Sequence, residues 1–432
     1  MRDLIYKLQT HMTTYGYQVL DVPVIEDADL FLTKAGDQIA ERLFTFQRSG
    51  RNLALRPEFT ASAAHQYSQL LPPDVARWQF SGMVFEDDPN GHFQRMSAGA
   101  ELFGLSGAMA DAEVVAMAAL GADLLNVQDW QIVIGHVGLT RHLLAQFALD
   151  VRTERFILHR RALLTEETRE FAAQLEAYLP TENTLVDSEL SSEQQAQHML
   201  DVLLDASSYG GTMGGRTRHD IARRLLVKRQ QASQREHVDA AVHFLREWGQ
   251  IHDEVETAFT QIAAFVGDDS QAQHILEEWR ALVGLLGAYG IPAERIRIQP
   301  DLVRTWDYYT GMVFEIRAKD GRLIAGGGRY DELTRLIGGQ DNLPAVGFAY
   351  YLDQLAGVVD APMQPLVMTY PLNAVETAIQ WAQTLRQHGV AVALSAGDTG
   401  ELTLIDGDML YGARRYAPDD SAALVKEIHN AR

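Results

Sequence analysis

Short strand-like stretches that helices do not regularly separate are the feature of this sequence that most limits its fold. The stretches are rich in β-branched and aromatic residues and are bounded by Gly, Pro or Asp. A doubly wound parallel sheet needs a helix between most successive strands, and the intervals here do not supply one. We therefore expect an α+β fold built on a mostly antiparallel sheet flanked by helices. The predicted strands cover Tyr17–Ile25, Leu53–Leu55, Trp78–Phe85, Glu101–Leu105, Gln131–Val137, Ile296–Ile298 and Met312–Ala318.

The 432-residue chain divides into three predicted parts. In residues 143–290, Ala, Leu, Glu, Gln and Arg dominate and apolar residues recur at helical spacing, which predicts a mainly helical insertion. Residues 1–142 and 291–360 then form a discontinuous core domain around the sheet. Residues 361–432 form a small C-terminal α/β module.

Helix boundaries are marked near both ends of the chain. An amphipathic helix is expected over residues 3–15, with Asp3 as its N-cap and Gly16 ending it. In the C-terminal module a helix opens at Asn373, where Glu376 has capping-box spacing. The strands of this module are predicted at Leu366–Tyr370, Val390–Leu394 and Glu401–Ile405.

Charge and composition exclude several classes of chemistry. The chain has 37 basic and 58 acidic side chains, and its net charge of −21 opposes the capture of a polyanion such as nucleic acid. It has no cysteine, so disulfides, thiol nucleophiles and thiolate metal sites are excluded. The N-terminus lacks the apolar segment of a signal peptide, and no run of about 18 apolar residues exists, so we expect a cytoplasmic protein. We expect neither a metal nor a cofactor.

One basic cluster stands against this acidic background, within the predicted helical insertion. It could contact RNA, an acidic protein or only solvent, and a solvated helix face is the simplest interpretation. The Gly-rich segment Tyr209–Arg218 overlaps it, lacks the GK[ST] ending of a phosphate loop, and is interpreted as a turn between helices. The cluster consists of Arg216, Arg218, Arg223, Arg224, Lys228, Arg229 and Arg235.

Four stretches combine charge, glycine and aromatic residues in a way that core packing alone does not require. They are LRPEFT at 55–60, the segment 80–104, LVRTWDYYTGMVFE at 302–315, and AGGGRYDEL at 325–333 followed by PAVGFA at 344–349. Together with IGHVGL at 134–139, these motifs resemble histidyl-tRNA synthetase, a class II aminoacyl-tRNA synthetase, in that family's order over most of residues 1–360. The resemblance implies the class II synthetase fold, with its antiparallel sheet.

The resemblance also implies a pocket for free L-histidine, because the ammonium and carboxylate of an amino acid each need a charged partner. In the family, the acid and hydroxyl of LRPE-x-T contact the α-amino group, which assigns Glu58 and Thr60 to that role. The arginine of LVR binds the carboxylate side, which is Arg304. Ser97 stands where the family has Gln, and its shorter hydroxyl reaches less far toward the amino group.

The ring of the bound histidine is expected to have its own partners. The acid before LFG lies on the ring side in the family, which places Glu101 near the imidazole. The tyrosines of DYY, Tyr308 and Tyr309, close over the ring. The structural alternative is that Glu58 and Arg304 form an ordinary buried ion pair and that the two tyrosines are core aromatics.

The positions that would hold ATP depart from the family pattern. Class II enzymes bind the ATP phosphates through arginines, because a planar bidentate cation offsets the triphosphate charge. Glu86, in the phrase VFEDD, stands at the first of these positions and Gln354 at the second. Exchanging Arg for Glu changes the local charge by two units, and the loss of both arginines predicts near-complete loss of ATP binding. Asp87 and Asp88 could help to hold magnesium, although a solvated acidic turn is the simpler interpretation.

An amino-acid pocket without ATP-binding cations resembles the synthetase-derived regulatory subunit of ATP phosphoribosyltransferase. That resemblance implies a non-catalytic, histidine-sensing subunit in histidine biosynthesis that assembles with a short-form catalytic subunit. A homodimer through the opening helix and the strand Val22–Ile25 is also implied. The segment from Asp360 onward contains nine acidic and five basic residues, and it is shorter than the family's anticodon module. We therefore do not expect tRNA as a partner. The alternatives are a genuine or divergent histidine–tRNA ligase, and a paralogue that binds an amino acid or RNA for another purpose.

Overall fold

The computed structural model describes two compact units of the chain, residues 1–359 and residues 360–432. Most of the predicted basic cluster, from Arg216 to Arg229, and the segment Tyr209–Arg218 lie outside the described residues, whereas Arg235 begins a described helix. The structure describes residues 2–33, 37–70, 75–88, 91–165, 168–178, 235–339, 341–356, 365–397 and 400–431.

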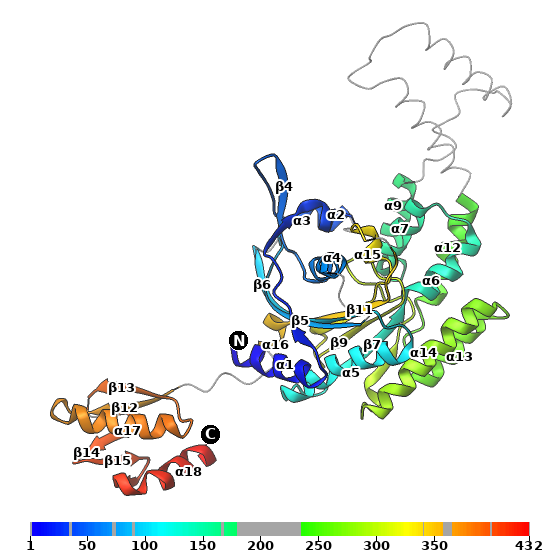
Figure 1. Ribbon diagram of the computed structural model, residues 1–432. Coiled ribbons are helices and arrows are strands. Elements are labelled where there is room, and N and C mark those ends of the chain that lie inside the picture. Colours follow the sequence, from blue (N-terminus) through cyan, green and yellow to red (C-terminus); the bar gives the residue numbers. More distant parts are fainter. Residues whose placement is uncertain are drawn as a thin grey trace, which may run out of the picture. The chain divides into compact units, whose positions relative to one another are not determined.

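An eight-stranded sheet forms the centre of the first unit (Figure 1). Strand β1 pairs with β5 in parallel, β7 pairs with β8 in parallel, and the other five neighbouring pairs are antiparallel. The expected α+β fold with a mostly antiparallel sheet is confirmed. In spatial order the strands are β1 (Gln18–Val19), β5 (Ala76–Phe85), β6 (Gln94–Phe103), β11 (Ala345–Tyr351), β10 (Leu323–Arg329), β9 (Met312–Arg317), β7 (Gln131–His136) and β8 (Ile296–Ile298).

Helices cover both faces of this sheet. Figure 1 shows α1 (Arg2–Thr14) and α5 (Ala108–Leu124) along one face, and α4 (Thr60–Leu70) and α15 (Leu333–Leu336) over the other. Strand side chains alternate between the two faces. On β6, Ala98, Ala100 and Leu102 pack in the hydrophobic cluster that contains α5, so the intervening residues, Glu101 among them, face the side of α4. Alternation on one strand thus separates an apolar face from a face that carries a carboxylate.

The prediction of one strand over Tyr17–Ile25 is wrong. Strand β1 ends at Val19, and its last ladder contact is the Leu20 N–H donating to the Gln79 carbonyl at 2.8 Å. Pro23 follows and has no N–H to donate, which prevents the ladder from continuing. The chain then enters a separate three-stranded sheet of β2 (Ile25–Asp27), β4 (Arg51–Leu55) and β3 (Thr45–Arg48), beside α2 (Ala28–Leu32) and α3 (Asp37–Arg42).

The described part of residues 143–290 is mainly helical, and its helices pack against the face of the sheet that α5 covers. Trp248, Trp279 and Leu286 belong to the same hydrophobic cluster as Ile132 of β7. That this stretch is a separate domain stays a prediction. The helices here are α6 (Val137–Leu144), α7 (Val151–His159), α8 (Arg161–Thr165), α9 (Thr168–Tyr178), α12 (Arg235–Trp248), α13 (Val255–Val266) and α14 (Ser270–Ala288).

The second unit has its own sheet and core. Buried Leu366, Trp381, Leu402 and Ile428 are part of its hydrophobic cluster. The predicted cap at Asn373 is wrong, because a short 3-10 helix, Leu372–Ala374, precedes α17 and no side chain caps α17. In spatial order the strands are β13 (Val392–Ala396), β12 (Leu366–Tyr370), β14 (Leu402–Ile405), β15 (Asp408–Tyr411) and β16 (Arg414–Tyr416), and the helices are α17 (Val375–Gln387) and α18 (Ser421–Ala431).

Candidate functional site

One pocket of the first unit gathers most of the residues that the sequence analysis singled out. Its wall combines the loop before α4, strands β6, β10 and β11, and the segment 304–309, and we call it the central pocket. Its lining includes seven of the nine residues proposed from the sequence: Glu58, Thr60, Ser97, Arg304, Tyr308, Tyr309 and Gln354. The other two, Glu101 and Glu86, contact residues of the lining.

Glu58 lies just before helix α4, caps the first turn of the helix with its carboxylate, and lines the central pocket. Its Oε1 atom accepts the Ala61 N–H at 2.7 Å, and its Oε2 atom accepts the N–H of Thr60. These are two of the N–H groups that have no partner inside a helix, and a carboxylate there is favoured by the helix dipole. Burial nevertheless raises the pKa of Glu58 to about 7, because the charged form loses its water.

Glu101 lies directly behind the pocket wall and is bonded to two residues that line it. Its Oε1 atom accepts the Thr60 hydroxyl at 2.6 Å, and its Oε2 atom accepts the hydroxyl of Tyr330. Burial, with a smaller contribution from the charge of Glu58, raises the pKa of Glu101 to about 8. Thr60 thus joins half-buried Glu58 and buried Glu101, donating its N–H to Glu58 and its hydroxyl to Glu101.

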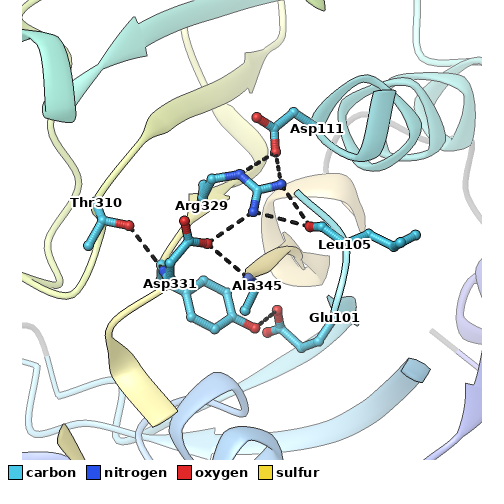
Figure 2. Close-up of polar contacts among 8 residues, drawn as sticks. Glu101, Leu105, Asp111, Thr310, Arg329, Asp331 and Ala345 are labelled. Atoms are coloured by element: carbon cyan, nitrogen blue, oxygen red, sulfur yellow. Dashed lines mark hydrogen bonds and ion pairs between the residues drawn. The ribbon is translucent and has the colours of Figure 1, made fainter. Parts of the chain in front are cut away.

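A polar frame on β10 holds Tyr330 in place. Figure 2 shows Arg329 between Asp111 and Asp331, with donor distances of 2.8 Å from Nε to Asp111 Oδ1 and 3.0 Å from Nη1 to Asp331 Oδ1. Asp331 Oδ1 also accepts the Ala345 N–H at 2.9 Å. Arg329 therefore ties β10 to α5 and β11, while Tyr330 bonds Glu101 at the pocket.

Arg304 is buried and is paired inside the protein. Its Nη1 atom lies 3.2 Å from Glu315 Oε1, and its Nη2 atom donates to the Tyr351 hydroxyl at 2.8 Å. Burial alone would lower its pKa, but Tyr351, Tyr309 and Glu315 together hold the pKa above its ordinary value. The alternative of a Glu58–Arg304 ion pair is therefore not what the structure contains. Its Nε atom is buried and has no hydrogen-bond partner among the described residues.

Aromatic rings form another wall of the central pocket. The rings of Tyr308 and Tyr309 lie 4.7 Å apart, and Tyr308 lies 5.6 Å from Tyr330 and stacks at 5.8 Å on Trp306. Burial raises the pKa of both Tyr308 and Tyr309, so their hydroxyls stay protonated. Ser97 contributes a smaller polar group, whose hydroxyl donates to the Tyr350 carbonyl at 3.3 Å.

Arginines of helices α6, α7 and α8 fix the segment that carries Arg304 and the tyrosines. Arg161 Nη2 donates to the Val303 carbonyl at 3.1 Å, and Arg155 Nε lies 3.1 Å from Asp307 Oδ2. From α6, Arg141 Nη1 donates to the Tyr309 carbonyl at 3.0 Å. The segment is therefore tied to α6, α7 and α8.

The two positions that would hold ATP phosphates differ in placement. Gln354 lines the central pocket, whereas Glu86 is not in the lining and pairs with Arg42 at 3.2 Å and with Arg95 at 2.5 Å. Arg95 does line the pocket. As for magnesium, no group of three or more His, Asp or Glu side chains within the described ranges could hold a metal ion.

Sequence reasoning missed several residues of the pocket. Tyr330 stood inside the quoted motif AGGGRYDEL, and Tyr351 follows directly on the motif PAVGFA and the residue Tyr350. Trp306 and Arg95 also line the pocket. Hydrogen bonds to Glu101 and Arg304 distinguish the two tyrosines from core residues, and this information lies in the pairing of strands and not in the local sequence.

Known proteins with similar sequences cover most of the chain. A family model described as histidyl-tRNA synthetase matches residues 1–209 and 198–355. The ATP phosphoribosyltransferase regulatory subunit of Mesorhizobium japonicum is 34% identical over 360 residues, which span 79% of this chain and 93% of that protein. The protein of the same name from a Chelativorans species is 30% identical over 347 residues, spanning 78% and 92%.

Solved structures agree on the fold. An ATP phosphoribosyltransferase regulatory subunit/histidyl-tRNA synthetase from Bacillus halodurans superposes with a TM-score of 0.66 at 20% identity, covering 91% of this chain and 88% of that one. A histidyl-tRNA synthetase from a Nostoc species gives a TM-score of 0.65 at 15% identity, covering 99% and 94%. The class II synthetase-like fold expected from the motifs is confirmed.

Proposed function

The chain belongs to the histidyl-tRNA synthetase family and, within it, to the ATP phosphoribosyltransferase regulatory subunits, and from that membership we propose that it regulates a separate, short-form catalytic ATP phosphoribosyltransferase. In this proposal the chain acts in histidine biosynthesis, binds L-histidine as the feedback signal, and forms no aminoacyl-adenylate. The observation that carries the proposal is the set of charges at the central pocket.

The central pocket offers complementary groups to each end of a histidine zwitterion. Within the described residues, the hydrogen-bond donors to the side chains of half-buried Glu58 and buried Glu101 are backbone N–H groups and hydroxyls, none of them a cation. An ammonium group or a protonated imidazole would compensate the two acids. Arg304, which lines the same pocket, supplies the opposite charge for a carboxylate. Tyr308 and Tyr309 supply aromatic faces for the imidazole ring.

The same pocket is poorly suited to a triphosphate. Both arginines of its lining already face a carboxylate of the protein, Arg95 facing Glu86 and Arg304 facing Glu315. Gln354 brings no charge to its position in the lining. These features support a role in sensing rather than in adenylation, because adenylation needs cations directed at the phosphates.

Histidine binding is the first test of the proposal. Calorimetry should detect saturable binding of L-histidine, and histidine at about 100 times its dissociation constant should stabilise the fold by about 2.7 kcal/mol in thermal unfolding. Mixing with a short-form catalytic subunit should then raise that enzyme's activity and make it sensitive to histidine, with a coupling free energy of about 1–3 kcal/mol. Failure of histidine to bind would contradict the sensing role.

Partner choice can be tested separately. A pull-down should recover the catalytic subunit, and a filter-binding titration should show no tight binding of tRNA. Repeating both with Arg223, Arg224 and Arg229 changed to Glu tests the basic cluster of the sequence, because phosphate contacts by these residues would make tRNA binding strongly salt-dependent. Tight tRNA binding that these changes abolish, without recovery of a catalytic subunit, would overturn the proposal.

A histidine–tRNA ligase is the second candidate, favoured by the family model that matches residues 1–355. It predicts histidine-dependent exchange of pyrophosphate into ATP, and our proposal predicts exchange at background. Exchange that disappears in Glu58→Ala would restore the ligase.

Two further parts of the proposal concern assembly and location. We propose a homodimer, supported by the exposed apolar residues Tyr6, Val19 and Ile25 in the opening helix and the first two strands. We propose a cytoplasmic location and no membrane partner. None of the helices in the described ranges is both long and apolar enough to span a bilayer.

A further inference from the structure

Glu86 is held between two arginines where β5 leads into the loop before β6. Its Oε1 atom lies 3.2 Å from Arg42 Nη1, and its Oε2 atom lies 2.5 Å from Arg95 Nη2. The Glu86 side chain is 17% exposed, whereas the side chains of both arginines are 40% exposed. The carboxylate is therefore the inner member of the cluster, and both arginine side chains are partly exposed to solvent.

Backbone contacts hold this cluster together, and Arg95 connects it to the central pocket. The Glu86 N–H donates to the Phe93 carbonyl at 3.2 Å, and the Asp87 N–H donates to the Arg42 carbonyl at 2.8 Å. The segments that carry the three charged residues are therefore fixed to one another. Because Arg95 also lines the central pocket, the cluster adjoins that pocket.

Two guanidinium groups around one carboxylate form the arrangement with which proteins bind phosphate and carboxylate ligands. We propose that Arg42 and Arg95 form a polyphosphate site that Glu86 occupies from within, so that Glu86 is the residue by which this protein rejects nucleoside triphosphates. The inference rests on the proposed function and deepens it. One of the two cations, Arg95, lines the central pocket, and Glu86 is the counter-ion of both.

Neutralising that counter-ion should open the site. The three side chains together carry one positive charge, and Glu86→Gln raises this to two while leaving both arginines without their shared carboxylate. ATP and inorganic triphosphate, each measured by equilibrium dialysis against the full chain, should bind Glu86→Gln at least tenfold more tightly than the unaltered protein. Comparison of the two probes separates phosphate recognition from contacts with the nucleoside.

Two variants complete the design. The double variant Glu86→Gln/Arg95→Gln should bind triphosphate no more tightly than the unaltered protein. Glu113→Gln neutralises a different ion-paired carboxylate, 3.0 Å from Arg77 and outside the lining of the central pocket, and should bind no more triphosphate than the unaltered chain. An equal gain in Glu113→Gln would show a general effect of net charge and would overturn the proposal.

Histidine binding serves as the internal measure of folding. If Glu86→Gln still binds histidine but does not bind triphosphate, the proposed polyphosphate site of Arg42 and Arg95 is contradicted. The histidine-sensing role is then unaffected. Absence of histidine binding in the unaltered chain counts against the proposed function instead. If Glu86→Gln and Glu86→Ala both fail to fold, Glu86 has a structural role and the proposal is wrong.

Discussion

Gly347 faces Glu101 so closely that a methyl group on Gly347 would lie 1.5 Å from Glu101 Oε2. The two residues are paired across the antiparallel strands β11 and β6. The absence of a side chain at Gly347 therefore provides the space in which the Glu101 carboxylate reaches Thr60 and Tyr330. A glycine on one strand thus determines where the buried acid of the next strand lies.

Gly347→Ala should displace Glu101 and weaken histidine binding at least tenfold. Adding a methyl group to a filled core typically costs about 1–3 kcal/mol, so the melting temperature should also fall. Calorimetry and thermal unfolding measure the two effects. Gly284→Ala is the matched control, because a methyl group there meets nothing within 4 Å and alanine favours the helix α14 by about 0.5–1 kcal/mol. Normal histidine affinity in Gly347→Ala would contradict this role of Gly347.

Stability should fall as the pH rises from about 5 to about 8. Burial raises the pKa of Glu58 to about 7 and that of Glu101 to about 8, whereas a glutamate of the unfolded chain titrates near pH 4.3. In this window the folded protein binds more protons than the unfolded chain, so the free energy of unfolding decreases with pH. Denaturant unfolding of the ligand-free protein at several pH values measures the slope.

Glu101→Gln is the control for that slope, which should be shallower in the variant because one titrating group is gone. The affinity for histidine should have the opposite pH dependence to the stability of the ligand-free protein. Its ammonium group favours the ionised acids, so affinity should increase between about pH 6 and pH 8. A stability that rises with pH in the ligand-free protein, or a slope unchanged by Glu101→Gln, would count against the raised pKa values.

Arg304→Gln should reduce the affinity for histidine about tenfold to a hundredfold, because a charged hydrogen bond contributes about 1.5–3 kcal/mol. Histidinol has no carboxylate, so its affinity should change far less, and calorimetry with both ligands separates carboxylate recognition from loss of folding. Arg317→Gln is the matched control: Arg317 lies 2.5 Å from the same Glu315 but does not line the central pocket. Equal losses for histidine and histidinol would contradict the assignment of Arg304.

Light scattering should give the mass of a homodimer. Val19 is 67% exposed and Ile25 is 49% exposed, and the combined change Val19→Glu/Ile25→Glu should shift the mass toward the monomer, because two buried charges would lie at the contact. Val151 is 76% exposed on α7, and Val151→Glu should leave the dimer intact. A monomeric mass for the unaltered chain would rule out this mode of assembly.

Strands with an apolar and β-branched pattern could be predicted from the sequence, and glycine-rich strands could not. Ile296–Ile298 and Leu366–Tyr370 have the bounds that were predicted for them. Strand β10 was missed because its sequence, LIAGGGR, has no alternating pattern. One of its glycines provides the space for the Arg304 side chain, because a methyl group on Gly326 would lie 1.9 Å from Arg304 Nη1. The sequence does not show where Arg304 lies, so this requirement for glycine could not be predicted.

The candidate site shows the same division between local motifs and tertiary contacts. Motif resemblance placed Glu58, Thr60 and Arg304 in a common site, and the structure brings all three to the central pocket. The partners of these residues could not be predicted in this way. Glu315 on β9 pairs with Arg304 from the same quoted motif, and Arg95 pairs with Glu86 across the hairpin of β5 and β6. The motifs contain these residues but do not show which of them meet, because that depends on how the loops and strands fold back on one another.

Glu58 has two separate roles for one carboxylate. The carboxylate accepts two N–H groups at the start of helix α4, and it is also proposed to face the ligand. Each carboxylate oxygen has two lone pairs, so a helix N–H and an ammonium group can share it. Natural selection for folding alone would therefore retain an acid at this position after histidine recognition had been lost. Among related proteins, the glutamate of LRPE is consequently weak evidence for amino-acid binding, whereas an arginine at the position of Arg304, which begins no helix, would be stronger evidence.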